Sequence, residues 1–255
     1  MNISYLITKY IIIPLMKKLI IQTLEDFMSV QYGVPEIDFF RGQSSSEYKL
    51  IPSIGRRFNE GQEDVLKQYE REIFVDFKRK YSMFTDTRPK NDKEFLFLAQ
   101  HYGLPTRLLD WTYNPLIALY FACCSNFDKD GVVYHSYPFS MRVFNEDKDD
   151  ILSFPAITLL VPNMTDVRYK NQNGLFVLYP EPWKEDFGYI FAKYIIRAHN
   201  KREILRKLKK IGITRSFIMP SLDSLCKDIV DIYNLRYSYA IKSVSYTHLT
   251  LPTIA

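Results

Sequence analysis

The chain has 255 residues, of which 47% are hydrophobic and 15% aromatic, enough to bury the core of one large domain or two small ones. This composition excludes a disordered chain, and a total of nine glycines excludes flexible glycine-rich linkers. The net charge of +5 is modest and allows an anionic partner. Without a basic–aromatic repeat or a zinc-ligand spacing, however, the sequence does not favour a nucleic-acid binder.

The three cysteines are Cys123, Cys124 and Cys226. Adjacent cysteines can pair only in a strained geometry, and a small odd number is typical of a reducing compartment. No Cys/His spacing indicates a metal site. We therefore expect a cytoplasmic protein without a bound metal.

Both ends of the chain are expected to lie outside the folded domain. The apolar stretch at residues 10–16 is shorter than the roughly 20 residues that cross a bilayer, so no membrane association is predicted. Translation could begin at Met16, which leaves residues 1–15 as a leader of uncertain status. Residues 244–255 (VSYTHLTLPTIA) resemble a translated sequencing adapter. The predicted domain is residues 16–239, and deleting both ends should lower its melting temperature by no more than about 2–4 °C.

The first half of the domain carries mainly helical signals. A capped helix is predicted over residues 23–31, and a short aromatic strand over residues 36–43 ends at Arg41 and Gly42. Residues 63–84 then form a long amphipathic helix to which we assign no chemistry. Its expected core-facing stripe is Leu66, Tyr69, Ile73, Phe77, Tyr81 and Phe84.

The densest polar stretch of the sequence follows the next helix. That helix runs from the Asn91 cap to Gly103, so His101 lies in its last turn, where the helix dipole favours an imidazolium. Residues 106–110 (TRLLD) read as a short strand. His101 could act as an acid or base near neutral pH, or bond a loop carbonyl at the helix end.

A buried helix begins directly after this stretch. Asn114 is its predicted cap, and residues 116–124 (LIALYFACC) are apolar on every side. Trp111 and Thr112 are expected in the loop before it. The start of such a helix offers unpaired N–H groups to an anion.

The second half of the domain is rich in strand signals. They cover residues 131–137, 156–162, 174–180 and 189–198. Two helices follow, over residues 201–212 and 221–233, the first with a basic face that we expect to be solvated. The pattern predicts a single α+β domain, in which a mixed or antiparallel sheet, plausibly split, surrounds the buried helix.

Several segments together resemble the FRG domain, which is named for a Phe-Arg-Gly motif. The segments are FFRGQ (39–43), LIPSIGR (50–56), LAQHYGLPTRLLDWTYNPLIALYFAC (98–123), RYKNQNGLF (168–176) and ILRKLKKIGITRSFIMPSLDSLCKDI (204–229). The resemblance covers roughly residues 23–233 and implies a bacterial or phage-associated protein. It implies no particular reaction.

A fainter similarity links these motifs to the arginine-serine-glutamate class of ADP-ribosyltransferases. In that class an Arg braces the NAD site, a hydroxyl residue orders it, and a late Glu polarises the ribose. The similarity would give the first two roles to Arg41 and Thr112. The late motif here offers Gln172, which can hold a ribose hydroxyl but cannot stabilise an oxocarbenium ion as a carboxylate does. NAD is therefore the cofactor to consider, for binding more than for transfer.

The leading hypothesis is a nucleotide-like anionic ligand in a cleft at Arg41 and Asp110. The catalytic candidates are Arg41, His101, Asp110 and Gln172, and the ligand-binding candidates are Arg41, Gly42, Arg107, Trp111, Thr112 and Asn114. Some sixty residues separate Arg41 from the motif at residues 101–112. A buried guanidinium needs acceptors, however, and the Asp110 carboxylate leaves a short strand in the same way.

A non-catalytic binding or interaction module stays open as the alternative. In that interpretation Arg41 and Asp110 form a structural pair, Trp111 is a core aromatic, and Gln172 belongs to a turn that opens a strand. An enzyme would need these polar groups to converge on an open pocket, whereas in a module they would be paired with one another. The sequence identifies no protein partner.

Overall fold

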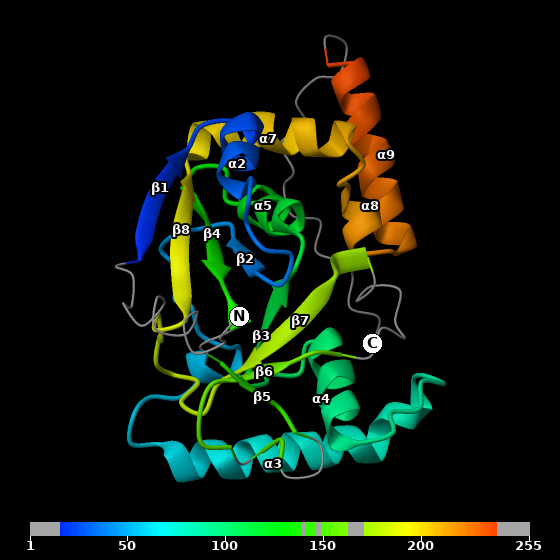
Figure 1. The fold of residues 1–255 in the computed structure, drawn as a ribbon. Helices are drawn as coiled ribbons and strands as arrows, with labels where there is room; N and C mark the ends of the chain where they lie inside the picture. Colours follow the sequence, from blue (N-terminus) through cyan, green and yellow to red (C-terminus); the bar gives the residue numbers. More distant parts are fainter. Residues whose placement is uncertain (1–15, 139–140, 146–148, 153, 163–170, 239–255) are drawn as a thin grey trace, which may run out of the picture. The chain divides into compact units, whose positions relative to one another are not determined.

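The computed structural model describes residues 16–138, 141–145, 149–152, 154–162 and 171–238. The chain forms two compact units, residues 1–213 and residues 214–255, and each is described by itself (Figure 1). No helix in the described part of the chain is long and apolar enough to cross a membrane. The predicted leader and the adapter-like tail lie outside the described residues.

The described strands of the first unit form one eight-stranded sheet in the order β1-β8-β4-β2-β3-β7-β6-β5. The strands are β1 (Lys17–Ile21), β2 (Phe39–Gln43), β3 (Leu108–Thr112), β4 (Gly131–Ser136), β5 (Arg142–Val143), β6 (Thr158–Leu160), β7 (Gly174–Leu178) and β8 (Ile190–Ile196). β1 runs parallel to β8 and β5 parallel to β6, whereas the other neighbours are antiparallel. The predicted α+β class with a mixed sheet is confirmed.

The helices of the first unit form two groups (Figure 1). One group consists of α2 (Leu24–Gln31), α5 (Pro115–Cys123) and α7 (Ala198–Lys210), and the other of α3 (Glu63–Lys80) and α4 (Asp92–His101). Two short 3-10 turns, η1 (Ile54–Arg56) and η2 (Tyr81–Met83), complete the unit.

The sheet is nearly divided between β2 and β3. These two strands share a single register pair, Phe40 with Thr112, whereas β2 pairs with β4 over five positions and β3 pairs with β7 over five. The sheet is therefore continuous and not split as expected, but its two halves meet at only one pair of residues.

Helix α5 packs directly on the backbone of the sheet. Six of its nine residues are buried, as its apolar sequence predicts. A Cβ atom on Gly42 would lie 1.8 Å from the carbonyl oxygen of Ala118, and one on Gly131 would lie 2.3 Å from that of Ala122. Both positions need glycine because the helix approaches too closely for a side chain.

The prediction for the α3 stripe is only partly right. The residues of α3 that are buried are Leu66, Glu70 and Phe74. Phe84, which was expected in the core, is 84% exposed because it follows η2, where the helix has ended. The buried face of α3 includes Glu70, which pairs with the buried Arg107. A periodicity of apolar residues cannot reveal such a polar partner.

Strand β3 begins two residues later than the sequence indicated. Trp111 and Thr112 lie inside the strand rather than in a loop, since they pair with Leu175 and Gly174 of β7. The prediction of a loop there is wrong. The Asn114 cap and the start of α5 at Pro115 are as predicted, with the Asn114 side chain accepting from the N–H of Leu116.

The expectation of a wholly solvated basic face on the first closing helix is wrong at Lys201. This side chain is fully buried, and its Nζ donates to the backbone carbonyls of Ser44 (2.8 Å), Ser125 (2.6 Å) and Asn126 (2.7 Å). A fourth bond goes to the carbonyl of Lys129 at 3.2 Å. The ammonium group therefore ties α7 to the loops after β2 and α5.

The second unit contains α8 (Arg215–Ile218) and α9 (Leu222–Arg236), the latter matching the last predicted helix. Thr214 and Ser221 cap these two helices through their hydroxyl groups. The buried carboxylate of Asp228 accepts from the N–H of Ser216 at 2.7 Å, which joins the two helices.

Candidate functional site

Arg41 and Asp110 meet across the gap between β2 and β3. Nη1 of Arg41 donates to the backbone carbonyl of Asp110 at 2.5 Å and lies 3.9 Å from its carboxylate. The Arg41 side chain is 15% exposed, whereas that of Asp110 is 63% exposed. The predicted contact exists, but the main acceptor is the backbone of Asp110 and not its charge.

The reason for this contact lies in the backbone hydrogen bonds of β3. The carbonyl of Arg107 and the N–H of Tyr113 both bond to the β7 side. Because these groups alternate along a strand, those of Leu108 and Asp110 must point toward β2. The two strands have already separated there, so the backbone groups need other partners.

Three side chains supply those partners. Thr106 Oγ1 accepts from the N–H of Leu108 at 3.2 Å, and Gln100 Nε2 donates to its carbonyl at 3.4 Å. Nη1 of Arg41 donates to the carbonyl of Asp110. Much of the polar motif in the sequence therefore completes the open edge of β3.

The guanidinium of Arg41 is surrounded by ionisable groups on the face of the sheet opposite α5. These include Arg56, Tyr134 and Tyr179. Burial lowers the pKa of Arg41 while Asp110 raises it, and burial raises the pKa of Tyr134 to about 12. The Nε and Nη2 atoms of Arg41 have no hydrogen-bond acceptor among the described residues.

Thr112 joins two loops and keeps no free hydrogen. Its hydroxyl donates to the carbonyl of Gln172 at 2.5 Å and accepts from the N–H of Asn114 at 3.0 Å. Gln172 therefore comes close to Thr112, as the similarity to ADP-ribosyltransferases implied, but through its backbone. The hydroxyl is committed to holding the chain in place.

The start of α5 offers few donors to an anion. Asn114 Oδ1 accepts from Leu116, and its carbonyl accepts from the N–H groups of Ile117 and Ala118. Pro115 carries no N–H. The groups that the sequence assigned to an anion thus already have acceptors.

Arg107 and Trp111 are core residues. Arg107 is buried and its Nε donates to Glu70 at 2.6 Å, while Nη1 donates to the carbonyl of Pro180 at 3.0 Å. Trp111 is 3% exposed and packs edge to face on Phe39 and Tyr189. Neither side chain is open to a ligand.

His101 lies in the last turn of α4, as predicted, and its ring meets that of Tyr102 with centroids 4.8 Å apart. Gly42 faces α5. The roles predicted for these two residues stay predictions, and for Gly42 the close helix accounts for the glycine.

A buried polar network escaped the sequence analysis. His135 of β4 bonds through Nε2 to the Asp38 carboxylate (2.7 Å) and through Nδ1 to the Tyr194 hydroxyl (3.0 Å), and its ring stacks on Phe40. The three polar residues of the network come from different strands or their ends, so no spacing in the sequence could have joined them. The network ties β2, β4 and β8 together on the face of the sheet opposite to Arg41.

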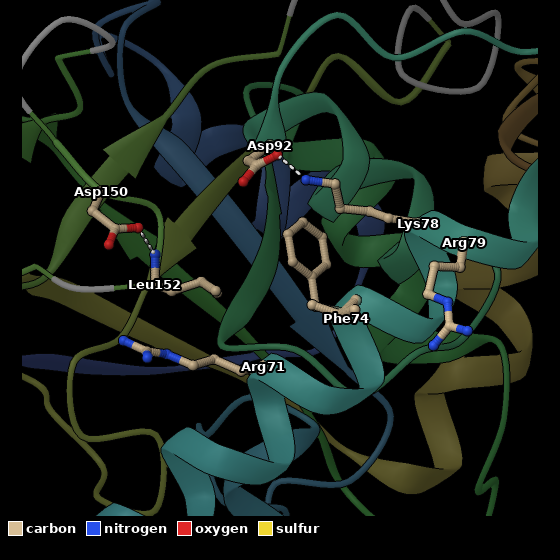
Figure 2. Close-up of a pocket in the computed structure, with 8 residues that line it drawn as sticks. Arg71, Phe74, Lys78, Arg79, Asp92, Asp150 and Leu152 are labelled. Carbon is tan, nitrogen blue, oxygen red and sulfur yellow. Dashed lines mark hydrogen bonds and ion pairs between the residues drawn. The ribbon is translucent and has the colours of Figure 1, made fainter.

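Two cavities flank the sheet. A groove of about 550 Å³ runs along α3, and Phe74, Arg71 and Asp150 are among the residues that line it (Figure 2). Two further lining residues form an ion pair, in which Nζ of Lys78 lies 2.6 Å from the carboxylate of Asp92. The α5 cavity, of about 790 Å³, lies where residues 34–37 meet the start of α5. Neither is lined by Arg41, His101, Asp110, Thr112 or Gln172.

The residues present fit NAD chemistry poorly. Arg41 has free N–H groups for a phosphate, but the Thr112 hydroxyl is used within the fold and Gln172 brings no carboxylate. Among the described residues, no cluster of His, Cys, Asp or Glu could hold a metal ion.

Comparison with curated proteins and with solved structures gave no match. The family model described as the FRG domain matches residues 37–131. This segment begins before β2 and ends at the first residue of β4, so it contains Arg41, Asp110, Thr112 and all of α5. The chain therefore contains an FRG domain at residues 37–131.

Proposed function

We propose that this FRG-domain protein binds a small anionic ligand of the nucleotide type through Arg41. The observation that carries the proposal is the incomplete set of hydrogen bonds at the guanidinium, where Nη1 is held by a carbonyl while Nε and Nη2 have no acceptor among the described residues. The side chain keeps 15% of its surface exposed. A guanidinium held in this way can offer a phosphate or carboxylate two parallel N–H groups.

The same geometry favours a binding module over an NAD-consuming enzyme. The hydroxyl of Thr112 already donates one hydrogen bond and accepts another, so it has no proton to offer a ligand. In the similarity to ADP-ribosyltransferases, Gln172 takes the position at which a transferase would need a carboxylate. We therefore assign Arg41 a binding role without a bond-breaking step.

Calorimetry with ADP-ribose tests the proposal. Wild-type protein should bind, and Arg41→Ala should weaken binding at least about tenfold, in line with the loss of a charge-assisted bidentate contact. Arg41→Lys should restore little, because lysine lacks the planar fork. Arg206→Ala is the matched control, since Arg206 is a half-exposed arginine paired with Glu203 on α7.

Two results would contradict the proposal. One is equal weakening by Arg41→Ala and Arg206→Ala, which would indicate attraction by net charge alone. The other is an absence of binding by the wild-type protein at millimolar ADP-ribose. Release of nicotinamide from NAD, followed by NMR, would instead overturn the non-catalytic assignment.

A further inference from the structure

The α5 cavity has the size and lining of a small-molecule site. Its volume of about 790 Å³ lies within the range of about 300–1,000 Å³ that is usual for such sites. Most of its wall is apolar and includes Val34, Pro35, Phe40 and Pro115. Prolines in the wall restrict the backbone, so the hollow is preformed.

Three polar side chains at its rim keep free hydrogen-bonding groups. Tyr113, Asn114 and Asn173 all line the cavity. Among the described residues, the hydroxyl of Tyr113, the Nδ2 of Asn114 and the side-chain amide of Asn173 have no hydrogen-bond partner. An apolar hollow with a few convergent polar groups is the usual design of a ligand site.

Thr112 holds these three residues in place. Its hydroxyl bonds to the carbonyl of Gln172 and to the N–H of Asn114, and the N–H of Tyr113 donates to the carbonyl of Asn173 at 3.0 Å. The loop before α5 and the turn before β7 are thereby joined. The rim of the cavity is a built structure and not a pair of independent loops.

The charge of the residues that line the cavity indicates which charge its ligand should carry. Glu36 is the charged side chain among the residues that line it, and it is exposed. The N–H groups at the start of α5 already have acceptors, so they offer nothing to an anion. The aromatic ring of Tyr113 at the cavity favours a cation, because the face of an aromatic ring is negative.

We propose that the α5 cavity binds a small organic cation, an amine with an apolar or aromatic body. Its body would lie on the proline and Phe40 wall, and its ammonium group would donate to the Tyr113 hydroxyl, the Asn173 amide oxygen and the Glu36 carboxylate. This site is independent of the anion site at Arg41, because Phe40 and Arg41 are neighbours in a strand and point to opposite faces of the sheet.

Three probes that share a phenyl ring test the charge preference: phenethylamine, the neutral 2-phenylethanol, and the anion hydrocinnamate. Binding to the full chain would be followed by saturation-transfer NMR and by shifts of side-chain amide signals. Phenethylamine should bind most tightly and hydrocinnamate most weakly. Binding of hydrocinnamate as tight as that of the amine would overturn the proposal. An absence of amine binding at about 10 mM would overturn it as well.

Variants locate the binding. Glu36→Gln should weaken the amine about two- to fivefold, the range for an exposed ion pair, and Tyr113→Ala should weaken it at least about tenfold. Glu60→Gln is the matched control, an exposed glutamate before α3 that does not line the cavity. Equal loss with Glu60→Gln, or no loss with Tyr113→Ala, would place the amine elsewhere. Arg41→Ala should leave amine binding unchanged, so failure of the anion proposal and failure of this one are separate results.

Discussion

Asp110 contributes its backbone more than its carboxylate to the contact with Arg41. The carbonyl lies 2.5 Å from Nη1, whereas the carboxylate is 3.9 Å away and the side chain is 63% exposed. An exposed ion pair at that distance adds little stability. Loss of Arg41 would thus leave a strand carbonyl without its donor, and not a buried charge without a partner.

The two residues should therefore respond differently to substitution. Asp110→Asn should change the free energy of unfolding by less than about 1 kcal/mol, because the backbone acceptor remains. Arg41→Ala should cost about 1–2 kcal/mol, from the lost hydrogen bond and the lost packing of its buried stem. Urea denaturation of both variants measures the difference.

Asp110→Asn should also tighten the binding of ADP-ribose, since it removes a negative charge beside Arg41. If Asp110→Asn destabilised the fold as much as Arg41→Ala, the carboxylate would be the partner that matters and the backbone explanation would be wrong. Weaker binding of ADP-ribose by the same variant would place the ligand elsewhere.

The cysteines differ in reactivity because they differ in burial. Burial raises the pKa of Cys123 to about 12, whereas Cys226 is exposed. At pH 8 only about one Cys123 thiol in ten thousand would be the reactive thiolate. Disulfide reagents at pH 8 should modify Cys226 quickly and Cys123 only in denaturant, because unfolding removes the burial that raises the pKa of Cys123.

A Cys226→Ser variant provides the control for this measurement. It should lose the fast phase of thiol modification while the phase that requires denaturant persists. Rapid modification of Cys123 in the folded protein, identified by peptide mass, would show that α5 opens far more readily than its burial implies.

At the scale of elements, α5 depends on two glycines. The helix lies against β2 and β4 so closely that no side chain fits at Gly42 or Gly131. The Phe-Arg-Gly motif therefore combines two separate requirements: Arg41 completes the edge of β3, and Gly42 admits the helix. A motif of adjacent residues need not mean a shared chemical role.

Gly42→Ala should be strongly destabilising. The added Cβ would lie 1.8 Å from a backbone oxygen, so α5 or β2 must shift, at a cost of at least about 3 kcal/mol. Gly188→Ala is the control, because its Cβ would meet only the end of the Asp186 side chain at 3.1 Å. Gly42→Ala should melt at a clearly lower temperature than Gly188→Ala. Similar melting temperatures would show that α5 can shift to make room for the added Cβ atom.

At the scale of the whole molecule, the segment matched by the FRG model cannot complete its own sheet. It contains β2 and β3, yet β3 pairs with β7 and β4 pairs with β8, both outside residues 37–131. Lys201, also outside, donates to carbonyls after β2 and α5. Strands without their neighbours leave backbone groups and apolar faces exposed.

A fragment of residues 37–131 should therefore fail to fold alone. Circular dichroism should show no cooperative thermal transition, whereas residues 16–238 should show one. A cooperative transition in the short fragment would mean that the match marks an autonomous domain and that β7, β8 and α7 are additions to it.

The sequence by itself determined the elements whose signals are local. Caps at Asn91 and Asn114 and the apolar run of α5 were identified because a cap and a periodic stripe involve residues only a few positions apart. The closing helices and four of the five later strands were found in the same way, while the two-residue strand β5 was missed. The FRG motifs identified the FRG domain. The contact between Arg41 and Asp110 was predicted from the need of a buried guanidinium for acceptors.

Only the tertiary structure decided what the polar residues do. Whether the Thr112 hydroxyl is free or bonded depends on Gln172, 60 residues away. Glu70 has its partner 37 residues away, and Lys201 has one 157 residues away. Hydrogen-bonding groups of the same kind can cap a strand edge or hold a ligand, and the difference is which neighbours the fold brings within about 3 Å. Sequence order does not encode that distance, because a buried polar group accepts whichever partner the packed sheet places beside it.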